Sequence, residues 1–160
     1  MNIVLRSRII PALLLKDGGL VKTVRFSNPT YVGDPINAVR IFNEKMADEL
    51  LVLDIEATSK NNEPNYSLIG KLARECRMPL CYGGGIKNIE QAKKIIGLGV
   101  EKIALSSAIL SQLNFIDELV QTFGSQSIVV VLDVKKSFLG KYSVFTHNGK
   151  IKVKNDISDL

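Results

Sequence analysis

Glycine and hydroxyl residues follow directly after apolar runs of this chain, at positions where they could bind an anion. Gly83-Gly84-Gly85 follows an apolar run that ends at Tyr82, and a helical pattern begins shortly afterwards. Backbone N–H groups in a glycine loop that leads into a helix can bind a phosphate. Ser106 and Ser107 follow the next apolar run and could share that anion through their hydroxyl groups. The glycines alone are a weak signal, because glycine also makes tight turns, and the serines strengthen it.

Two aspartates and one lysine stand near the ends of other apolar runs. Asp133 follows residues 128–132, and Asp54 follows residues 50–53. A carboxylate at the end of a buried strand is costly unless it is hydrogen-bonded or functional, so each aspartate either serves the chemistry or anchors the next loop. Position alone does not decide between these roles. Lys22 could reach an anion at the same end of the strands, although a solvated hairpin lysine would show the same pattern.

The hydrophobic pattern predicts the elements that must position these residues. Continuous apolar runs predict buried strands at 9–15, 50–53, 78–82, 100–105 and 128–132, with a further extended segment at 21–26. Helical spacing predicts helices at 35–46, 64–73, 88–98 and 115–123, the first of them capped by Asp34 and the second opened by Pro64. Alternating strands and helices predict a parallel sheet with right-handed crossovers. We therefore expect the candidate residues to meet at the carboxyl ends of the strands.

An internal repeat indicates how much of a barrel the chain contains. Residues 9–26 align without a gap on residues 128–145, and the identities include Lys16 with Lys135. The alternative is chance similarity between two apolar strands with basic turns, but the matches continue beyond the strand. Two repeat units would span about 240 residues, close to the roughly 250 of an eight-stranded barrel. We therefore expect an α/β fold, a partial (β/α)8 TIM barrel with about the first five parallel strands and their helices. Residues 1–160 would form one domain, the N-terminal half barrel plus the truncated start of the second half.

Composition narrows the classes of function. A chain that is 46% hydrophobic and 23% charged is typical of a soluble globular domain. The net charge of +5 comes from scattered lysines and arginines, with one local cluster at Lys150, Lys152 and Lys154. No basic run alternates with aromatic residues, so nucleic-acid binding is not favoured, and a phosphorylated small molecule explains the positive excess equally well. The apolar run at 9–15 is too short for a membrane span and lacks a signal-peptide pattern.

The cysteines and the histidine predict neither a metal site nor a disulfide framework. Cys76 and Cys81 form no CxxC pair and have no histidine nearby. This usage predicts a reduced, cytoplasmic protein without zinc or another cofactor. His147, the sole histidine, lies in the polar turn 146–149, where we expect a solvated loop residue.

Several short motifs, taken in chain order, resemble one enzyme family. They are Arg8-Ile9-Ile10-Pro11, Lys16-Asp17-Gly18, Val21-Lys22, Gly33-Asp34-Pro35, Asp48-Glu49-Leu50, Leu53-Asp54-Ile55, Gly83-Gly84-Gly85-Ile86 and Gln121-Thr122-Phe123-Gly124-Ser125-Gln126. From Arg8 to about Lys150 the chain is similar to the cyclase subunit of imidazole glycerol phosphate synthase. The resemblance implies a histidine-biosynthesis barrel that accepts ammonia from a glutaminase partner. It also implies conversion of a phosphoribulosyl-formimino carboxamide nucleotide into imidazole glycerol phosphate and an aminoimidazole carboxamide nucleotide.

The resemblance also implies roles for individual positions. Asp133 matches one of the family's two acid/base aspartates, and Lys22 matches the lysine that closes over the substrate. Gly85 with its neighbouring glycines, Ser106 and Ser107 match one of two phosphate sites, although the family more often has Asn and Thr at the serine positions. Three residues match a charged ring at the bottom of the barrel, where ammonia enters from the glutaminase: Arg8, Glu49 and Lys102. The fourth member of the ring would lie beyond Leu160.

Leu14 is the main departure from the family pattern. The family's other catalytic aspartate belongs at this position, and the internal repeat agrees, since Leu14 aligns with Asp133. Leucine cannot donate or accept a proton, so ring closure by two carboxylates should be impaired. The second phosphate site would lie in the missing half. Paralogues of this subunit act in surface-polysaccharide pathways, where they help a glutaminase and an amidotransferase-like enzyme convert a sugar's acetamido group into an acetamidino group. Loss of the first aspartate with the ammonia gate retained fits that branch.

Three hypotheses about function therefore remain open. The first is the cyclase itself, using Asp133 and impaired by Leu14. The second is a non-cyclase subunit that docks a glutaminase and passes ammonia onward. The third is an inert remnant, in which an open sheet would expose strand edges at Leu14 and Asp133 and favour self-association.

Overall fold

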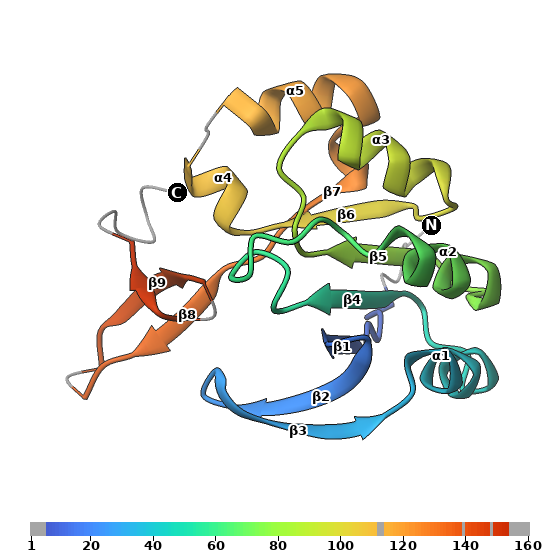
Figure 1. Cartoon of the computed structure of the whole chain (residues 1–160), viewed down its shortest axis with the longest axis horizontal. Coiled ribbons are helices and arrows are strands. Elements are labelled where there is room, and N and C mark those ends of the chain that lie inside the picture. The colour runs from blue at the N-terminus through green and yellow to red at the C-terminus, as the bar shows by residue number, and fades with distance from the viewer. Residues whose placement is uncertain (1–5, 112–113, 139, 148, 154–160) are drawn as a thin grey trace.

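Two β-sheets and a layer of helices make up the computed structural model, which describes residues 6–111, 114–138, 140–147 and 149–153 (Figure 1). The larger sheet has seven strands in the order β3-β2-β1-β4-β5-β6-β7, and the smaller one has the order β10-β9-β8. The strands are β1 Ala12–Lys16, β2 Gly19–Val24, β3 Ser27–Gly33, β4 Leu50–Asp54, β5 Leu80–Gly83, β6 Lys102–Leu105, β7 Ile128–Val130, β8 Asp133–Lys136, β9 Tyr142–Thr146 and β10 Ile151–Lys152. The helices are α1 Pro35–Glu44, α2 Tyr66–Glu75, α3 Ile89–Gly97, α4 Ser107–Ser111, α5 Asn114–Phe123 and the 3-10 turn η1 Ser125–Ser127.

The predicted partial (β/α)8 barrel is confirmed by the order and direction of the strands. β1, β4, β5, β6 and β7 are neighbours in chain order, and each pairs in parallel with the next. Helices cover one face of this sheet, where Val52, Tyr82 and Ile103 are at most 1% exposed. On the opposite face Leu51 and Leu53 stay half-buried. The described strands therefore form an open part of a barrel ring whose inner face remains accessible.

Side-chain caps define where the helices begin. Asp34 Oδ1 accepts a hydrogen bond from the Asn37 N–H at 2.9 Å, which confirms the predicted start of α1. The prediction that Pro64 opens the second helix is wrong by two residues. Asn65 caps α2 by accepting from the Leu68 N–H at 3.1 Å, so the helix begins one residue after this cap.

Antiparallel hairpins follow the first and fifth parallel strands. β2 folds back on β1, with Leu14 opposite Val21, and β3 extends the sheet by pairing with β2. The pattern at 21–26 predicted one extended segment, whereas the structure has two strands with a turn between them. β8, β9 and β10 form the smaller sheet, and the pairing of β10 with β9 confirms the hairpin-like pattern around Lys152. Lys154 lies outside the described residues.

Three expectations about the parallel strands are corrected. The first strand begins at Ala12 rather than at Ile9, which is 73% exposed. The fifth strand was predicted to be buried up to Asp133, but β7 ends at Val130, whose side chain is 51% exposed. Both strands are less buried than their apolar sequences predict, because helices cover only one face of the open sheet.

Of the two strand edges expected at Leu14 and Asp133, the first is absent and the second is present among the described strands. Leu14 pairs with β2 on one side and with Leu53 of β4 on the other. Asp133 opens β8 and lies opposite Phe145 of β9. β2 therefore covers the backbone at Leu14, whereas β8 is an edge strand of the smaller sheet, because among the described strands it pairs only with β9.

Candidate functional site

Each glycine of the loop after β5 is required by its surroundings. A Cβ atom on Gly83 would lie 2.7 Å from the Ala104 carbonyl oxygen, and one on Gly84 would overlap the backbone of Asp54. Gly84 and Gly85 also have φ angles of 118° and 73°, which are strained for residues with a side chain. The loop therefore brings bare backbone close to the neighbouring strand ends, as the predicted anion site requires.

A pocket of about 90 Å³ lies at the carboxyl ends of β4, β5 and β6. Most of the predicted site residues share it: Asp54, Gly83, Gly84, Gly85, Ser106, Ser107 and Asp133. The glycine loop and the serine pair thus lie on the same rim of the sheet, although they are more than 20 residues apart in the sequence. Backbone N–H groups and hydroxyl groups that converge in one small pocket can bind a phosphate group.

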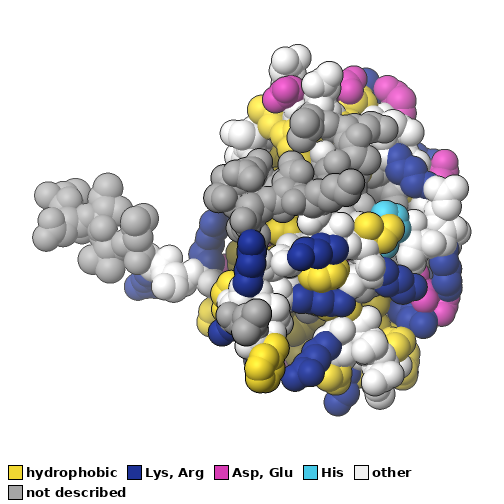
Figure 2. Space-filling model, turned by 90° about the vertical axis from the view of Figure 1, so that its left-hand side faces the viewer, with side chains coloured by type: hydrophobic (Ala, Val, Ile, Leu, Met, Phe, Trp, Pro, Cys, Tyr) yellow, Lys and Arg dark blue, Asp and Glu magenta, His cyan; other side chains and the backbone are white. Residues whose placement is uncertain are grey.

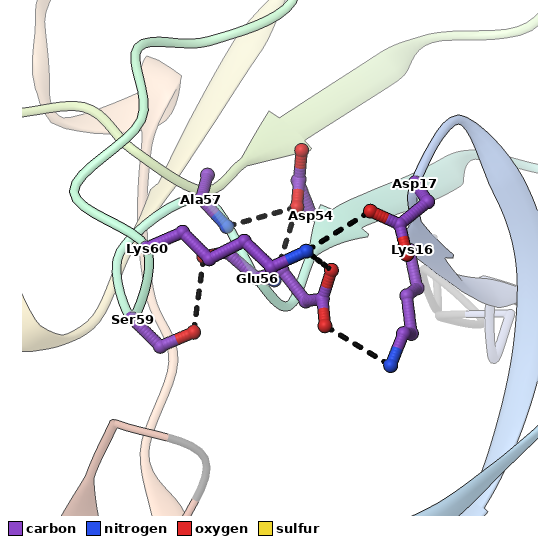
Figure 3. A network of polar contacts seen from close by, with 7 residues as sticks. All are labelled: Lys16, Asp17, Asp54, Glu56, Ala57, Ser59 and Lys60. Carbon is purple, nitrogen blue, oxygen red and sulfur yellow. Dashed lines mark hydrogen bonds and ion pairs between the residues drawn. The ribbon is translucent and has the colours of Figure 1, made fainter.

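Asp54 acts as an anchor of the loop that follows β4. Its Oδ1 atom accepts hydrogen bonds from the N–H groups of Glu56 and Ala57, each at 3.0 Å (Figure 3). This geometry supports the anchoring role that the sequence left open. The side chain still lines the pocket, so the anchor also contributes negative charge beside the glycine loop.

An ion-pair network joins the loop after β4 to the turn after β1 (Figure 3). Glu56 pairs with Lys16 at 3.0 Å and with Lys60 at 2.5 Å, and Lys60 also pairs with Asp17 at 3.0 Å. The hydrogen bond from Lys60 holds the pKa of Asp17 below its usual value, and the hydrogen bond to Glu56 raises the pKa of Lys60. The two loops are therefore tied together at the rim of the sheet.

Burial shifts the protonation equilibrium of Asp133. It is half-buried at the start of β8 rather than at the end of the fifth strand. Burial raises the pKa of its carboxyl group, while a backbone hydrogen bond from Gly149 and the charge of Lys135 oppose that rise. A carboxyl group whose pKa lies above its usual value can exchange a proton more readily near neutral pH.

A second cavity of about 280 Å³ brings Leu14 and Asp133 together. The two positions that the internal repeat aligns therefore line one space, with Lys16 and Lys150 beside them. An apolar side chain, that of Leu14, thus shares this space with the Asp133 carboxyl group. Lys22 lines neither cavity. It is an exposed residue of β2, and its neighbour Val21 lies opposite Leu14. Successive residues of a strand point to opposite faces, so Lys22 points away from the face that carries Leu14.

Arg8, Glu49 and Lys102 come together at the opposite end of the strands. Glu49 is only 4% exposed, and its Oε2 atom lies 2.6 Å from Lys102 Nζ and 3.7 Å from Arg8 Nη1. A buried carboxylate needs such cationic partners to offset the loss of hydration. In the sequence, only the family resemblance grouped these three residues. The structure places them in one cluster.

His147 is the site residue that the sequence analysis missed. It is half-buried and lines the pocket with the glycine loop, Ser106 and Asp133, so the expectation of a solvated loop residue is wrong. The register of the smaller sheet explains its position. Because Asp133 lies opposite Phe145, the turn that begins two residues later returns to the start of β8. The hairpin pattern was the signal in the sequence that could have placed it there.

Both cysteines are free thiols, and neither lines the pocket. Burial raises the pKa of Cys81 to about 12, and the Cys76 thiol donates a hydrogen bond to the Met78 carbonyl at 3.2 Å. Within the described ranges, no three His, Cys, Asp or Glu side chains are grouped as metal ligands. In the same ranges, no helix has the length and apolar character needed to cross a membrane.

Comparisons with known proteins show the family to which the chain belongs. The family described as "Histidine biosynthesis protein" matches residues 8–160. "Putative imidazole glycerol phosphate synthase subunit hisF2" of Pseudomonas aeruginosa is 59% identical over 144 residues, which cover 90% of this chain and 57% of that protein. A Leptospira borgpetersenii protein, "Putative imidazole glycerol phosphate synthase subunit HisF", is 56% identical over 157 residues, or 98% of this chain and 62% of that protein.

A third relative shows the same partial coverage. "Putative imidazole glycerol phosphate synthase subunit hisF3" of Vibrio vulnificus is 58% identical over 149 residues, 92% of this chain and 57% of that protein. The chain thus spans about three fifths of the length of these curated relatives. The family match extends over nearly the whole sequence, and the observed open parallel sheet is the matching fold. The chain belongs to the histidine biosynthesis protein family.

Proposed function

We propose that this chain is a cyclase-type subunit of imidazole glycerol phosphate synthase, binding a phosphorylated substrate at one end of its strands and receiving ammonia at the other. One observation carries the proposal. Lys102 at the start of β6 and Ala104 beside Gly83 face the same side of the sheet, two residues apart. The backbones of Lys102, which belongs to the charged cluster, and Ala104, which lines the pocket, thus lie about 7 Å apart along one strand face, at a rise of roughly 3.3 Å per residue.

The pocket favours a phosphate ester as the ligand. Its glycine loop supplies backbone N–H groups, and Ser106 and Ser107 supply hydroxyl groups. Figure 2 looks onto this end of the molecule and shows many Lys and Arg side chains with few acidic ones. A basic rim raises the local concentration of anionic substrates. In the proposed reaction Asp133 would exchange protons with the bound substrate, and Lys22 would have to move from its exposed position on β2 to contact it.

The opposite end favours a partner that delivers ammonia. The relatives are named as subunits of a synthase, and we propose a glutaminase as the partner of this chain, docked around Arg8, Glu49 and Lys102. Ammonia is small and uncharged, so its passage needs only a local separation of the Lys102–Glu49 ion pair. The proposed assembly would act in the cytoplasm, and the reaction as proposed requires no cofactor.

Leu14 supports a second candidate function. A subunit without the second carboxylate could still dock a glutaminase and pass ammonia to another enzyme. Conversion of a sugar's acetamido group into an acetamidino group, for a surface polysaccharide, would use ammonia in this way. The Leu14→Asp variant separates the two functions, because it should raise imidazole product formation only if the chain is a cyclase.

The test of the main proposal combines two assays on the whole chain. Glutamine hydrolysis by a glutaminase from the same genome should rise at least tenfold when the chain is added. Lys102→Met should remove this rise, while Lys93→Met, which lies on the outer surface of α3, should not. Product formation with ammonium salt alone, without the glutaminase, then tests the pocket at the carboxyl ends of the strands. Absence of both complex formation and glutaminase activation would contradict the proposal.

A further inference from the structure

We propose that His147 is a substrate-binding residue whose imidazole contacts the same phosphate ester as the glycine loop. This inference rests on the proposed function, because it assumes that the pocket binds an anion. Its starting point is the set of side chains around that pocket. Two of them, Asp54 and Asp133, carry carboxyl groups, and His147 is the one described lining residue that can become a cation.

A cationic group would offset the negative charge of the pocket. A phosphate bound between the glycine loop and Ser106 would lie in a space that two carboxylates also line. Like charges at short range are unfavourable, and backbone N–H groups supply only partial positive charge. A protonated imidazole at this position would offset the repulsion and donate a charge-assisted hydrogen bond. No other described side chain of the pocket can do both.

The turn that carries His147 is held in place through the two backbone groups of one residue, Gly149. Lys135 Nζ donates a hydrogen bond to the Gly149 carbonyl at 2.6 Å, and the Gly149 backbone also hydrogen-bonds to the Asp133 carboxyl group. Gly149 is buried, with a φ of 71°, and a Cβ atom there would lie 2.6 Å from Lys135 Cε. The start of β8 therefore holds this turn, and with it His147, at a defined place beside Asp133.

The imidazole itself has one nitrogen engaged within the turn. His147 Nδ1 lies 3.1 Å from Thr146 Oγ1, and Thr146 is buried. The backbone at His147 adopts a φ of 54°, a left-handed conformation in which histidine, like asparagine and aspartate, is enriched among residues with a side chain. The Nδ1 contact orients the ring, and it leaves Nε2 as the atom that can meet a ligand.

The test uses the fact that the chain has a single histidine. Nitrogen-15 spectra of the imidazole therefore report on His147 without assignment. Glycerol phosphate serves as the phosphate ester and glycerol as the uncharged control. We expect saturating glycerol phosphate, but not glycerol, to raise the pKa of the imidazole by about one unit, which corresponds to about tenfold tighter binding by the protonated form.

A second measurement uses a probe whose own charge does not change with pH. Inorganic sulfate keeps its charge between about pH 5.5 and pH 8, so any change of its affinity there comes from the protein, and protonated imidazole should bind sulfate about tenfold more tightly than neutral imidazole. The carboxyl groups of Asp54 and Asp133 line the same pocket as the ring, and Lys150 belongs to the same turn, where its N–H donates to the Thr146 carbonyl at 3.0 Å. Burial raises the pKa of Asp133, so Asp133→Asn tests how much this carboxyl group contributes to the pH dependence. In His147→Gln the affinity for sulfate should not change with pH.

Two other outcomes are distinguishable. If glycerol phosphate shifts the backbone amides of Gly84 and Gly85 while the imidazole pKa stays unchanged, the pocket binds phosphate and the inference about His147 is wrong. If neither the amides nor the imidazole respond, the phosphate-binding function fails, and the inference fails with it. Ser106→Ala is the matched control, because it should weaken binding but keep the coupling between phosphate and the imidazole.

Discussion

The hairpins after β1 and after β7 have related sequences but hold their polar residues in different ways. In the first, β1 continues through Lys16 into a tight turn and pairs directly with β2. In the second, β7 stops at Val130, and a separate strand, β8, pairs with β9. The chain is extended along one sheet in the first case and changes sheets in the second. Because of this break, Asp133 lies at the start of a strand, beside the turn that follows β9.

The matched lysines show the same difference. Lys16 forms a partly exposed ion pair with Glu56 at 3.0 Å. Lys135, its partner in the repeat, lies between the rings of Phe26 and Phe145 and donates to Gly149. The two phenylalanines are themselves aligned by the repeat. The two hairpins therefore have the same residue types at matched positions, but different neighbours give these residues different roles.

The largest effect is expected at Asp133. Asp133→Asn should lower ammonia-dependent product formation by roughly 10²–10⁴-fold, because the amide cannot transfer a proton. The same change should preserve or raise the free energy of unfolding at pH 7. The folded-state pKa of this carboxyl group is raised, so its stabilising contribution is complete below the unfolded pKa and is lost as the pH rises through the folded value. Assays of product and urea unfolding at acidic and neutral pH measure both effects.

Asp54→Ala is the contrasting variant. Asp54 holds the loop through two backbone hydrogen bonds, so its removal should lower the free energy of unfolding by about 1–3 kcal/mol. Equal losses of stability in Asp133→Asn and Asp54→Ala would contradict the separation of a catalytic from an anchoring carboxylate.

Leu14→Asp gives the two aligned positions of the repeat, 14 and 133, the same residue type. If the chain retains cyclase geometry, the variant should raise product formation about 10²-fold, since it restores a second group for proton transfer. A carboxylate facing Asp133 across one cavity should also raise the pKa of Asp133 further. Leu14→Asn, which is similar in size and polarity but does not titrate, is the control. No gain in product with a folded variant would favour the non-cyclase function.

Glycine substitutions compare the turns of the two hairpins. Gly149→Ala should lower the free energy of unfolding by about 2 kcal/mol, because φ is positive and the new Cβ would press on Lys135. Gly18→Ala should cost about 1 kcal/mol, since Gly18 has a φ of 79° but nothing within 4 Å of the new atom. Denaturant unfolding of both variants measures the difference. A larger loss for Gly18→Ala would mean that the second turn is not held as described.

The smallest effects are expected at the matched lysines. Lys135→Met should cost about 1–2 kcal/mol, because it removes a hydrogen bond and contacts with two aromatic rings. Lys16→Met should cost about 0.5 kcal/mol or less, since the ion pair is partly exposed and Glu56 keeps Lys60 as a partner. Equal losses in thermal unfolding would remove the proposed difference between the hairpins.

Much of the fold could be predicted from the sequence because its signals are local. Apolar runs and helical spacing predicted the five parallel strands and four helices, and Asp34 was predicted correctly as a cap. The glycine loop and the serine pair were placed at one rim because parallel strands end at the same edge. The short helix α4, strand β3 and the division between β7 and β8 were not predicted. Their sequences lack a clear period, and pairing with neighbours decides their conformation.

The sequence by itself determined the residue types of the site and the absence of a carboxylate at position 14. It also determined the order of strands and helices along the chain. Only the tertiary structure decided that Asp54 anchors a loop, that Lys22 stands away from the pocket and that His147 enters it. These three outcomes depend on which face a strand presents and on where a hairpin turn returns. Such contacts join residues that are far apart in the chain, so local patterns carry little information about them.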